Sequence, residues 1–365
     1  MRVYVPAVHR LPATVLCFAV GACTPPAADE TAADTGPGSP GETDTPIDTA
    51  HTGDSGEELG ILPPEGHPAS GWFSVPPDRG LTWERDRSFA IEEFTVPQMV
   101  VMADGTLRMY ATNMAEPSAR WVMESLDGLT WGTPSEALRP EAFAPLDCGD
   151  RIEDIAPLYR PSGLDLVAEG SSNPDHTQPA VWRKFCRLNN ADPGPAVPDT
   201  AAYFYEGEAS DNQQISVPAT VALPDWSALL YFVGNQTQSD EGIRVVSVST
   251  DGALSARLGT VPVLDRTCVD PLPIYLEGGG IRLFHTHGHG GGPGFADSVD
   301  GISFSGDSAL IPHEGEDCMT TGGECLLDPA FLRLPDDRLV LYFTRLQSVE
   351  RGGFTARIER AFATD

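Results

Sequence analysis

A hairpin-like pattern recurs five times along this chain, and the repeat constrains the fold more than any other feature of the sequence. The first copy, residues 96–110, reads VPQMVVMADGTLRMY, which is an apolar run, an Asp-Gly turn and a second apolar run. Such a pattern is typical of a β-hairpin. In four copies an aromatic residue follows a proline after 13 positions: Pro97 and Tyr110, Pro218 and Tyr231, Pro271 and Phe284, Pro329 and Tyr342. A weaker copy covers residues 154–168, where Ile155 stands in place of the proline.

The spacing of the copies indicates how many strands each unit holds. Successive copies start 58, 63, 53 and 58 residues apart, which leaves room for about four strands per unit. The turn residues lie eight positions after the repeat proline, or after Ile155 in the weaker copy. They are Gly105, Gly163, Trp226, Gly279 and Asp337. The sequence therefore predicts an all-β fold, a five-bladed β-propeller, over residues 67–365. A six-bladed ring is the alternative, in which residues 186–216 form a degenerate blade.

A Ser-x-Asp-Gly turn follows the third predicted strand of three units, at residues 125–128, 249–252 and 298–301. The serine and aspartate side chains can bond backbone amides of the turn, and glycine accepts a positive φ. In two units an aromatic residue stands three positions after the glycine, where it can pack between neighbouring sheets. The turn resembles the Asp-box of sialidase-type β-propellers in a version one residue shorter, and in those families it is structural.

The two ends of the repeat region predict how the ring closes. Residues 80–83 read Gly-Leu-Thr-Trp, as residues 128–131 do, but they precede the first hairpin. The last unit reaches only its third strand at Asp365. We therefore expect an N-terminal strand to complete the last blade, because shared closure removes an open sheet edge.

The N-terminal segment reads as an export signal. Residues 1–22 combine a weakly basic start with an apolar run too short to span a bilayer. The run ends Val-Gly-Ala before Cys23, which resembles a bacterial lipobox and predicts lipidation of Cys23. Ordinary signal cleavage beside an incidental cysteine is the alternative. Residues 24–66 hold ten acids and no Lys or Arg, so the linker 23–66 is expected to be disordered. We expect a lipid anchor in the bacterial cell envelope, at the outer membrane or the cell surface.

Charge and cysteine content narrow the range of partners. The formal net charge is −30, from 53 acids and 23 bases, and such a surface repels nucleic acid and anionic lipid. Membrane contact is therefore expected through the anchor only, and the propeller is expected to be a monomer.

Export to an oxidising compartment permits disulfide bonds between the remaining cysteines. Cys318 and Cys325 are the expected pair, Cys148 with Cys186 is a second pairing, and Cys268 is left over.

The residue before each repeat proline is expected to open an inner strand near one mouth of the central funnel. These five positions are Val96, Asp154, Val217, Asp270 and Asp328. The repeat form resembles the five-bladed fold of glycoside hydrolase families 43 and 32, over roughly residues 70–365. Those enzymes use paired carboxylates as acid and base, with a third that tunes pKa. In family 43 the base Asp, the tuning Asp and the acid Glu come from the first, second and third blades.

By this resemblance, Asp154 in the second blade corresponds to the aspartate that tunes the pKa of the catalytic carboxylates. The first blade has Val96 at the base position, with Glu93 upstream, and the third blade has Val217 and no obvious acid. The catalytic candidates are Asp154, Asp270, Asp328 and Glu93. The three aspartates could instead hold Ca²⁺, bind sugar hydroxyls, or cap strand starts through backbone amides. No cofactor follows with certainty, and Ca²⁺ is the one considered.

The second strand of each hairpin is expected to end near the same mouth. Those ends are Asn113, Glu169, Asn235, His285 and Arg345. Candidate ligand-binding residues are Asn113, Asn235, His285, His287 and Arg345. Alternation places His285, His287 and His289 on one face if the strand persists, where three imidazoles could bind Zn or Cu. A sugar-contacting histidine, an incidental polar loop, and a salt-bridge role for Arg345 remain alternatives.

Two functions follow from these features. The first is a membrane-anchored extracytoplasmic propeller that binds a glycan and hydrolyses it as a glycosidase-like enzyme. The second is a non-catalytic surface scaffold that binds protein or a surface polymer. The departures at the first and third blades leave enzymatic activity undecided, and a fold alone does not decide it.

Overall fold

The computed structural model describes residues 60–139, 151–171, 183–189, 197–198, 204–205, 215–234, 242–258, 268–287, 292–311, 322–349 and 353–365. These residues form strands, turns and bends. Across these ranges there is no helix long and apolar enough to cross a membrane. Cys23, Cys148, His289, Asn235 and Cys318 lie outside the described residues, so the predictions made for them stay predictions.

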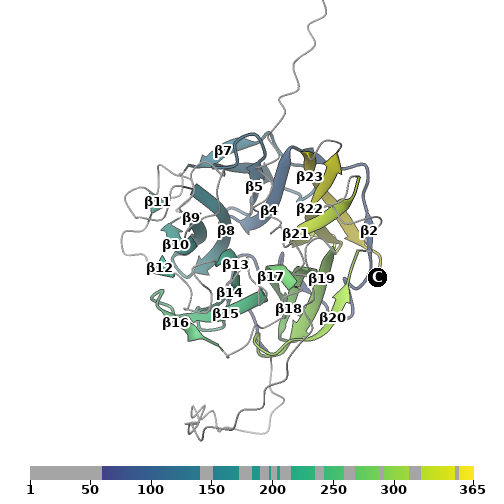
Figure 1. The fold of residues 1–365 in the computed structure, drawn as a ribbon. Helices are drawn as coiled ribbons and strands as arrows, with labels where there is room; N and C mark the ends of the chain where they lie inside the picture. The colour runs from purple at the N-terminus through teal and green to yellow at the C-terminus, as the bar shows by residue number, and fades with distance from the viewer. Residues whose placement is uncertain are drawn as a thin grey trace, which may run out of the picture. The chain divides into compact units, whose positions relative to one another are not determined.

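Five sheets surround a central axis as the blades of a five-bladed β-propeller (Figure 1). The first blade contains β4 (Phe94–Val101), β5 (Leu107–Asn113), β6 (Arg120–Ser125) and β7 (Ser135–Leu138). The second contains β8 (Arg151–Arg160), β9 (Gly163–Ser171) and β10 (Arg183–Asn189), with β11 (Val197–Pro198) and β12 (Phe204–Tyr205) paired to β10. The third contains β13 (Ser216–Ala222), β14 (Ala228–Gly234), β15 (Gly242–Val248) and β16 (Leu254–Arg257).

The last two blades also recruit strands from the N-terminal part of the propeller. The fourth contains β17 (Cys268–Leu276), β18 (Ile281–His287), β19 (Pro293–Ser298) and β20 (Ser305–Ala309), with β1 (Ser74–Val75) parallel to β17. The fifth contains β21 (Glu324–Arg333), β22 (Leu339–Val349) and β23 (Gly353–Ala363), with β2 (Trp83–Arg85) and β3 (Ile91–Glu92) paired to β23. The five-bladed prediction is confirmed. The six-bladed alternative is wrong for the described residues, because β11 and β12 both pair with β10 of the second blade.

The five predicted hairpins form as the sequence indicates. Positive φ angles occur at every predicted turn residue: Gly105, Gly163, Trp226, Gly279 and Asp337. The expectation that inner strands begin at the residue before the repeat proline is wrong, because each begins one to four residues earlier. A register shift instead falls at or beside that residue in all five inner strands. The extra residue of such a bulge bends the strand locally.

The bulges impose an unusual backbone on four of the five equivalent positions. Val96, Val217, Asp270 and Asp328 have φ angles of 53°, 51°, 54° and 52°. Aspartate tolerates this left-handed region better than most residues, whereas a β-branched valine there is a genuine outlier. The shared φ shows that these four residues occupy equivalent places although two are apolar.

The ring closes as predicted, with one change in the closing turn. β2 pairs antiparallel with β23, with Trp83 opposite Ala363. The Trp83 ring makes edge contacts with Phe284 of the fourth blade and Phe331 of the fifth, both at 6.4 Å. The Asp365 carboxylate accepts hydrogen bonds from the amides of residues 80–82. It thus replaces the aspartate within the turn, such as Asp127, that accepts the amide hydrogen bonds elsewhere.

The turn at residues 125–128 connects neighbouring blades. Asp127 Oδ1 accepts hydrogen bonds from the amides of Leu129 and Thr130 at 2.8 and 2.7 Å. The Trp131 ring lies edge-on to Tyr342 of the fifth blade at 5.9 Å, and the Tyr342 hydroxyl donates to Gly128 O at 2.5 Å. The turn at 298–301 repeats this arrangement toward the third blade, with Phe304 beside Tyr231. Aromatic contacts therefore connect the first blade to the fifth and the fourth blade to the third.

Residues 60–75 close one end of the central axis. The Ile61 amide donates to Val299 O, and the Gly280 amide donates to Ile61 O at 2.8 Å, so residues 60–66, assigned to the linker by the sequence, contact the fourth blade. The buried His67 ring lies 4.6 Å from Tyr159 and 5.8 Å from Tyr275. Burial lowers the pKa of His67 to about 4, so the imidazole is neutral at physiological pH.

Candidate functional site

Three inner strands bring aspartates together at the open end of the axis. Asp154 lies on β8, Asp270 on β17 and Asp328 on β21. The Asp328 amide donates a hydrogen bond of 3.4 Å to Asp270 Oδ2, and the charges of Asp154 and Asp270 act on Asp328. The expected convergence of these three side chains therefore agrees with the structure.

Burial and mutual repulsion alter how these carboxyls titrate. Burial raises the pKa of Asp154 to about 6, with Glu153 and Asp270 adding to the shift and Arg120 opposing it. Burial raises the pKa of Asp328 well above its ordinary value, and the Asp270 and Asp154 carboxylates raise it further. Neighbouring carboxyls whose pKa values are raised are typical of acid–base sites, although structural clusters of carboxyls show raised pKa values too.

A buried ion pair supports the cluster from the second blade. Glu169 on β9 is fully buried, and its Oε1 accepts a hydrogen bond of 2.8 Å from Arg183 on β10. Its Oε2 accepts one of 2.8 Å from the Val217 amide of the third blade. Burial raises the pKa of Glu169, while Arg183 opposes that shift. Glu169 therefore links two blades beside Asp154 and is withdrawn from any ligand.

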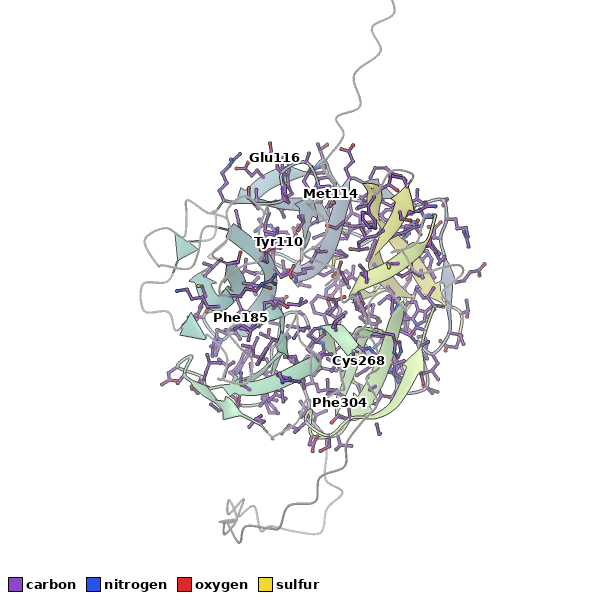
Figure 2. All side chains as sticks on the ribbon, in the orientation of Figure 1. Tyr110, Met114, Glu116, Phe185, Cys268 and Phe304 are labelled. Carbon is purple, nitrogen blue, oxygen red and sulfur yellow. The ribbon has the colours of Figure 1, made fainter. Side chains whose placement is uncertain are left out.

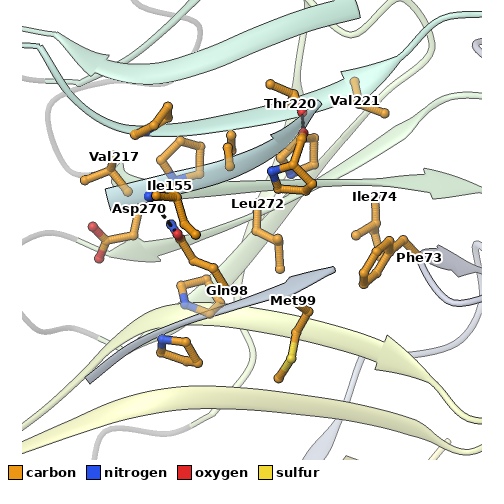
Figure 3. Close-up of a pocket in the computed structure, with 18 of the residues that line it drawn as sticks. Phe73, Gln98, Met99, Ile155, Val217, Thr220, Val221, Asp270, Leu272 and Ile274 are labelled. Carbon is orange, nitrogen blue, oxygen red and sulfur yellow. Dashed lines mark hydrogen bonds between the residues drawn. The ribbon is translucent and has the colours of Figure 1, made fainter. Parts of the chain in front are cut away.

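A small cavity follows the axis behind the aspartates. Its volume is about 80 Å³, and repeat prolines and neighbouring apolar side chains line it, with His67 and Phe73 at the closed end. Figure 3 shows Asp270 and Val217 at one end of this lining and Ile274 and Phe73 at the other. Ligand pockets usually measure about 300–1,000 Å³, so the axial cavity is too small for a sugar ring.

The other predicted site residues have different surroundings. Glu93 is exposed, one residue before β4, with a φ of 67°. Asn113 accepts a hydrogen bond of 2.8 Å from the Ala115 amide and so caps a local turn. Arg345 forms ion pairs with Glu324 and, at 3.7 Å, with Glu359. Arg345 thus adopts the salt-bridge arrangement that the sequence left as its alternative role.

The predicted histidines lie beside a cysteine that the sequence did not connect with them. His285 and His287 are on β18, and Cys268 begins the adjacent strand β17. The potential ligand atoms of these three residues all lie within 4.8 Å of one another. Among the described residues, no other three His, Cys, Asp or Glu side chains bring their potential ligand atoms this close together. The three aspartates of the mouth do not.

The sequence reasoning missed the residues that support the aspartates. Glu169 stood among the strand ends but was not selected, and Arg120 and Arg183 were not considered. Arg120 Nη2 lies 4.0 Å from Asp154 Oδ1 and is buried. For Glu169, a charged residue within the apolar run of β9 is the available signal, because buried charges are usually paired.

Comparison with known proteins defines the fold. No protein-family model matches the sequence, and no curated protein is significantly similar to it. A thermostable family-43 glycoside hydrolase matches with a TM-score of 0.53 at 14% identity, over 76% of this chain and 92% of its own. A family 117 glycoside hydrolase from the marine bacterium Zobellia galactanivorans matches with a TM-score of 0.51 at 14% identity, over 78% and 92%. An α-L-arabinofuranosidase from Podospora anserina matches with a TM-score of 0.51 at 10% identity, over 81% and 97%.

This chain has the five-bladed propeller fold of these glycoside hydrolases. In this propeller, Val96 and Val217 share the backbone conformation of Asp270 and Asp328. These four equivalent positions of the ring therefore share one backbone conformation, and acids occupy it in the fourth and fifth blades. With Asp154 from the second blade, the mouth aspartates come from three of the five blades.

Proposed function

We propose that the open mouth of the propeller binds a carbohydrate through Asp154, Asp270 and Asp328. The convergence of these three carboxyls from separate blades is the observation that supports the proposal. Asp154 is buried and Asp270 and Asp328 are half-buried on the inner strands, which limits their movement, and sugar hydroxyls both donate and accept hydrogen bonds. Each aspartate could therefore contact a different hydroxyl group of one ring.

Hydrolysis of a glycosidic bond is the more specific form of this proposal. A carboxyl with a raised pKa retains its proton near neutral pH and can donate it to a leaving oxygen. Burial and the charges of Asp270 and Asp154 raise the pKa of Asp328, which makes it the candidate acid, and Asp270 lies beside it as a candidate base or nucleophile. Asp154, with a pKa near 6, would adjust the charge of that pair.

A non-catalytic surface scaffold is the second candidate function. Val96 and Val217 stand where a family-43 enzyme would supply its base and acid, which favours binding without turnover. A scaffold could still recognise a glycan or surface polymer through the same aspartates, because binding requires no proton transfer.

We also propose that the propeller is exported and held at the cell envelope by a lipid on Cys23. The lipobox-like residues before Cys23 and the acidic linker support this location. Cys186 and Cys325 are both disulfide-bonded, which fits an oxidising compartment. Metabolic labelling with a radioactive fatty acid tests the anchor, and Cys23→Ala should abolish the labelling.

The decisive experiment is a thermal-shift and turnover screen of the full chain against a panel of poly- and oligosaccharides. Asp154→Asn and Asp328→Asn test the mouth, and Asp104→Asn is the matched control. Asp104 is an exposed aspartate in the first hairpin turn, at the end of β4 away from the mouth. Binding is expected as a rise in melting temperature that both mouth variants lose and the control retains.

Turnover separates the two functions. Release of sugar that Asp328→Asn abolishes would establish a hydrolase. A thermal shift without any released sugar would establish the scaffold. A panel that produces neither a shift nor turnover would refute carbohydrate binding, as would a shift that survives in both mouth variants.

A further inference from the structure

The cysteine and two histidines of the fourth blade form a compact group of potential metal ligands. Cys268 and His285 are buried, with exposed fractions of 1% and 0%, and His287 at the end of β18 is half-buried. Their potential ligand atoms lie within 4.8 Å of one another. Figure 2 labels Cys268 among the side chains of this blade.

The strand pairing explains why these three side chains meet. Cys268 lies directly opposite His287 in the antiparallel pair β17–β18, so both side chains point to the same face. His285 precedes His287 by two residues on β18 and therefore shares that face. The two imidazole rings lie 4.7 Å apart at an angle of 77°.

A glycine on the neighbouring strand leaves the space that the rings occupy. Gly294 on β19 pairs with His285. A Cβ atom added to Gly294 would lie 2.2 Å from His287 Nε2 and 3.0 Å from His285 Cε1. Any larger residue at position 294 would displace His287, so Gly294 is required for this arrangement of the two rings.

The chemistry of the group points to a borderline transition metal. Imidazole nitrogen and thiolate sulfur are ligands of zinc, whereas calcium requires oxygen ligands. Tetrahedral zinc sites hold their ligand atoms roughly 3.5 Å apart, as follows from the usual Zn–N and Zn–S distances of about 2.0–2.3 Å. Small side-chain rotations would contract a group within 4.8 Å to that size. Three ligands leave a fourth position for water or a bound molecule.

We propose that Cys268, His285 and His287 bind a zinc ion beside the mouth of the propeller. Cys268 lies two residues before Asp270 on β17. The ion would therefore join the start of β17 to the end of β18 and fix the segment that carries Asp270. A hydrogen-bonded Cys–His–His cluster in the blade interior, without metal, is the competing account.

Cobalt substitution followed by zinc competition tests the proposal in the full chain, purified without reductant so that its disulfides persist. After treatment with chelator and its removal, one equivalent of Co²⁺ should produce a thiolate-to-cobalt charge-transfer band, and Zn²⁺ should abolish it. Cys268→Ser should lose the band. His287→Ala should weaken Zn²⁺ binding by more than the about 10- to 100-fold that loss of an outer-shell partner costs.

Gly294→Ala keeps all three ligands and removes only the space for the rings. It should weaken Zn²⁺ binding strongly, whereas Gly71→Ala should not. Gly71 is a matched control because a Cβ atom there meets nothing within 4 Å. Circular dichroism of each variant distinguishes loss of the ligands from loss of the fold.

Two results would overturn the proposal. One is a folded wild-type chain that gives no charge-transfer band and no displacement by Zn²⁺. The other is tight Zn²⁺ binding that survives both Cys268→Ser and His287→Ala. The test requires no carbohydrate, so it remains informative if the proposed function fails, and Asp154→Asn should leave the metal affinity unchanged.

Discussion

Arg183 Nη1 donates a hydrogen bond of 2.8 Å to Glu169 Oε1, and both side chains are buried, with exposed fractions of 7% and 0%. The pair connects adjacent strands β9 and β10 of the second blade, and the other Glu169 oxygen reaches the third blade through the Val217 amide. The interaction therefore lies at the junction of two blades, directly behind the aspartates of the mouth.

Glu169→Gln should destabilise the propeller because it removes the carboxylate that acts most strongly on the buried Arg183 charge. Breaking a buried pair from one side typically costs about 3–5 kcal/mol. Glu124→Gln is the matched control, since Glu124 pairs with Arg108 at 2.9 Å but is 55% exposed, and such a change costs about 1 kcal/mol or less. Urea unfolding followed by tryptophan fluorescence measures both free energies. Equal losses in the two variants would contradict the structural role of the buried pair.

The raised pKa of Asp154 predicts a pH dependence of stability with a definite sign. Its pKa is about 6 in the folded state and 3.8 ordinarily, so between these values the folded chain binds more protons than the unfolded chain. The contribution of Asp154 to stability is therefore full below about pH 4 and decreases as the pH rises to about 6. The shift corresponds to about 3 kcal/mol, at about 1.36 kcal/mol per unit.

Asp154→Asn should remove this part of the pH profile. Unfolding free energies measured between pH 4 and pH 7 should decrease less steeply in the variant than in the wild type. The wild type and variant would show parallel profiles if Asp154 titrates normally. Asp104→Asn should preserve the wild-type slope, because Asp104 is an exposed turn residue whose hydrogen bond to the Thr106 amide an asparagine can also accept.

Asp328→Asn should stabilise the chain at pH 7 while it weakens the proposed ligand binding. The substitution removes a carboxyl whose pKa is raised by burial and by the charges of Asp270 and Asp154, so at pH 7 its ionisation favours the unfolded chain. Sites kept for function often cost stability in this way. A gain of about 1 kcal/mol would raise the melting temperature by roughly 2 °C in a domain of this size. At pH 4 the gain should disappear, since the Asp328 carboxyl is then protonated in the folded wild type. A gain of equal size at both pH values would exclude ionisation of Asp328 as its cause.

Local sequence signals were sufficient to predict the repeating parts of the fold. Asp104-Gly105 and the equivalent turn residues define hairpins through their backbone preference, and the hairpin spacing defines the blades. The convergence of Asp154, Asp270 and Asp328 followed because equivalent positions of a ring lie at the same end. Those predictions needed no knowledge of how one blade packs on the next.

Features that depend on register between strands could not be predicted. Cys268 faces His287 only because the bulge near Asp270 shifts the pairing by one residue, and with the register of Leu272 and Phe284 it would face residue 288. The Glu169–Arg183 contact likewise depends on the pairing of β9 with β10. The chain from Ile61 to Val75 carries no periodic pattern, so its position at the closed end of the axis was not foreseen.

Asp365→Ala should open the closure between the fifth blade and the N-terminal strand. The Asp365 carboxylate accepts hydrogen bonds from the amides of Gly80, Leu81 and Thr82 at 2.8, 2.8 and 3.0 Å, next to the paired strands β2 and β23. Loss of a comparable helix cap costs about 0.5–2 kcal/mol, and three amides would lose their acceptor here. Asp251→Ala is the matched control, because Asp251 accepts one backbone hydrogen bond, at 3.2 Å from Ala253.

Hydrogen exchange tests this closure directly, since local opening releases the amides of β2 before the rest of the fold. Exchange at residues 83–85 should accelerate in Asp365→Ala and remain at the wild-type rate in Asp251→Ala. These backbone bonds lower the pKa of Asp365, so their contribution is present near neutral pH and is lost as the pH falls through that lowered pKa. Unchanged exchange at β2 in Asp365→Ala would show that the strand pairing alone, without this carboxylate, closes the ring.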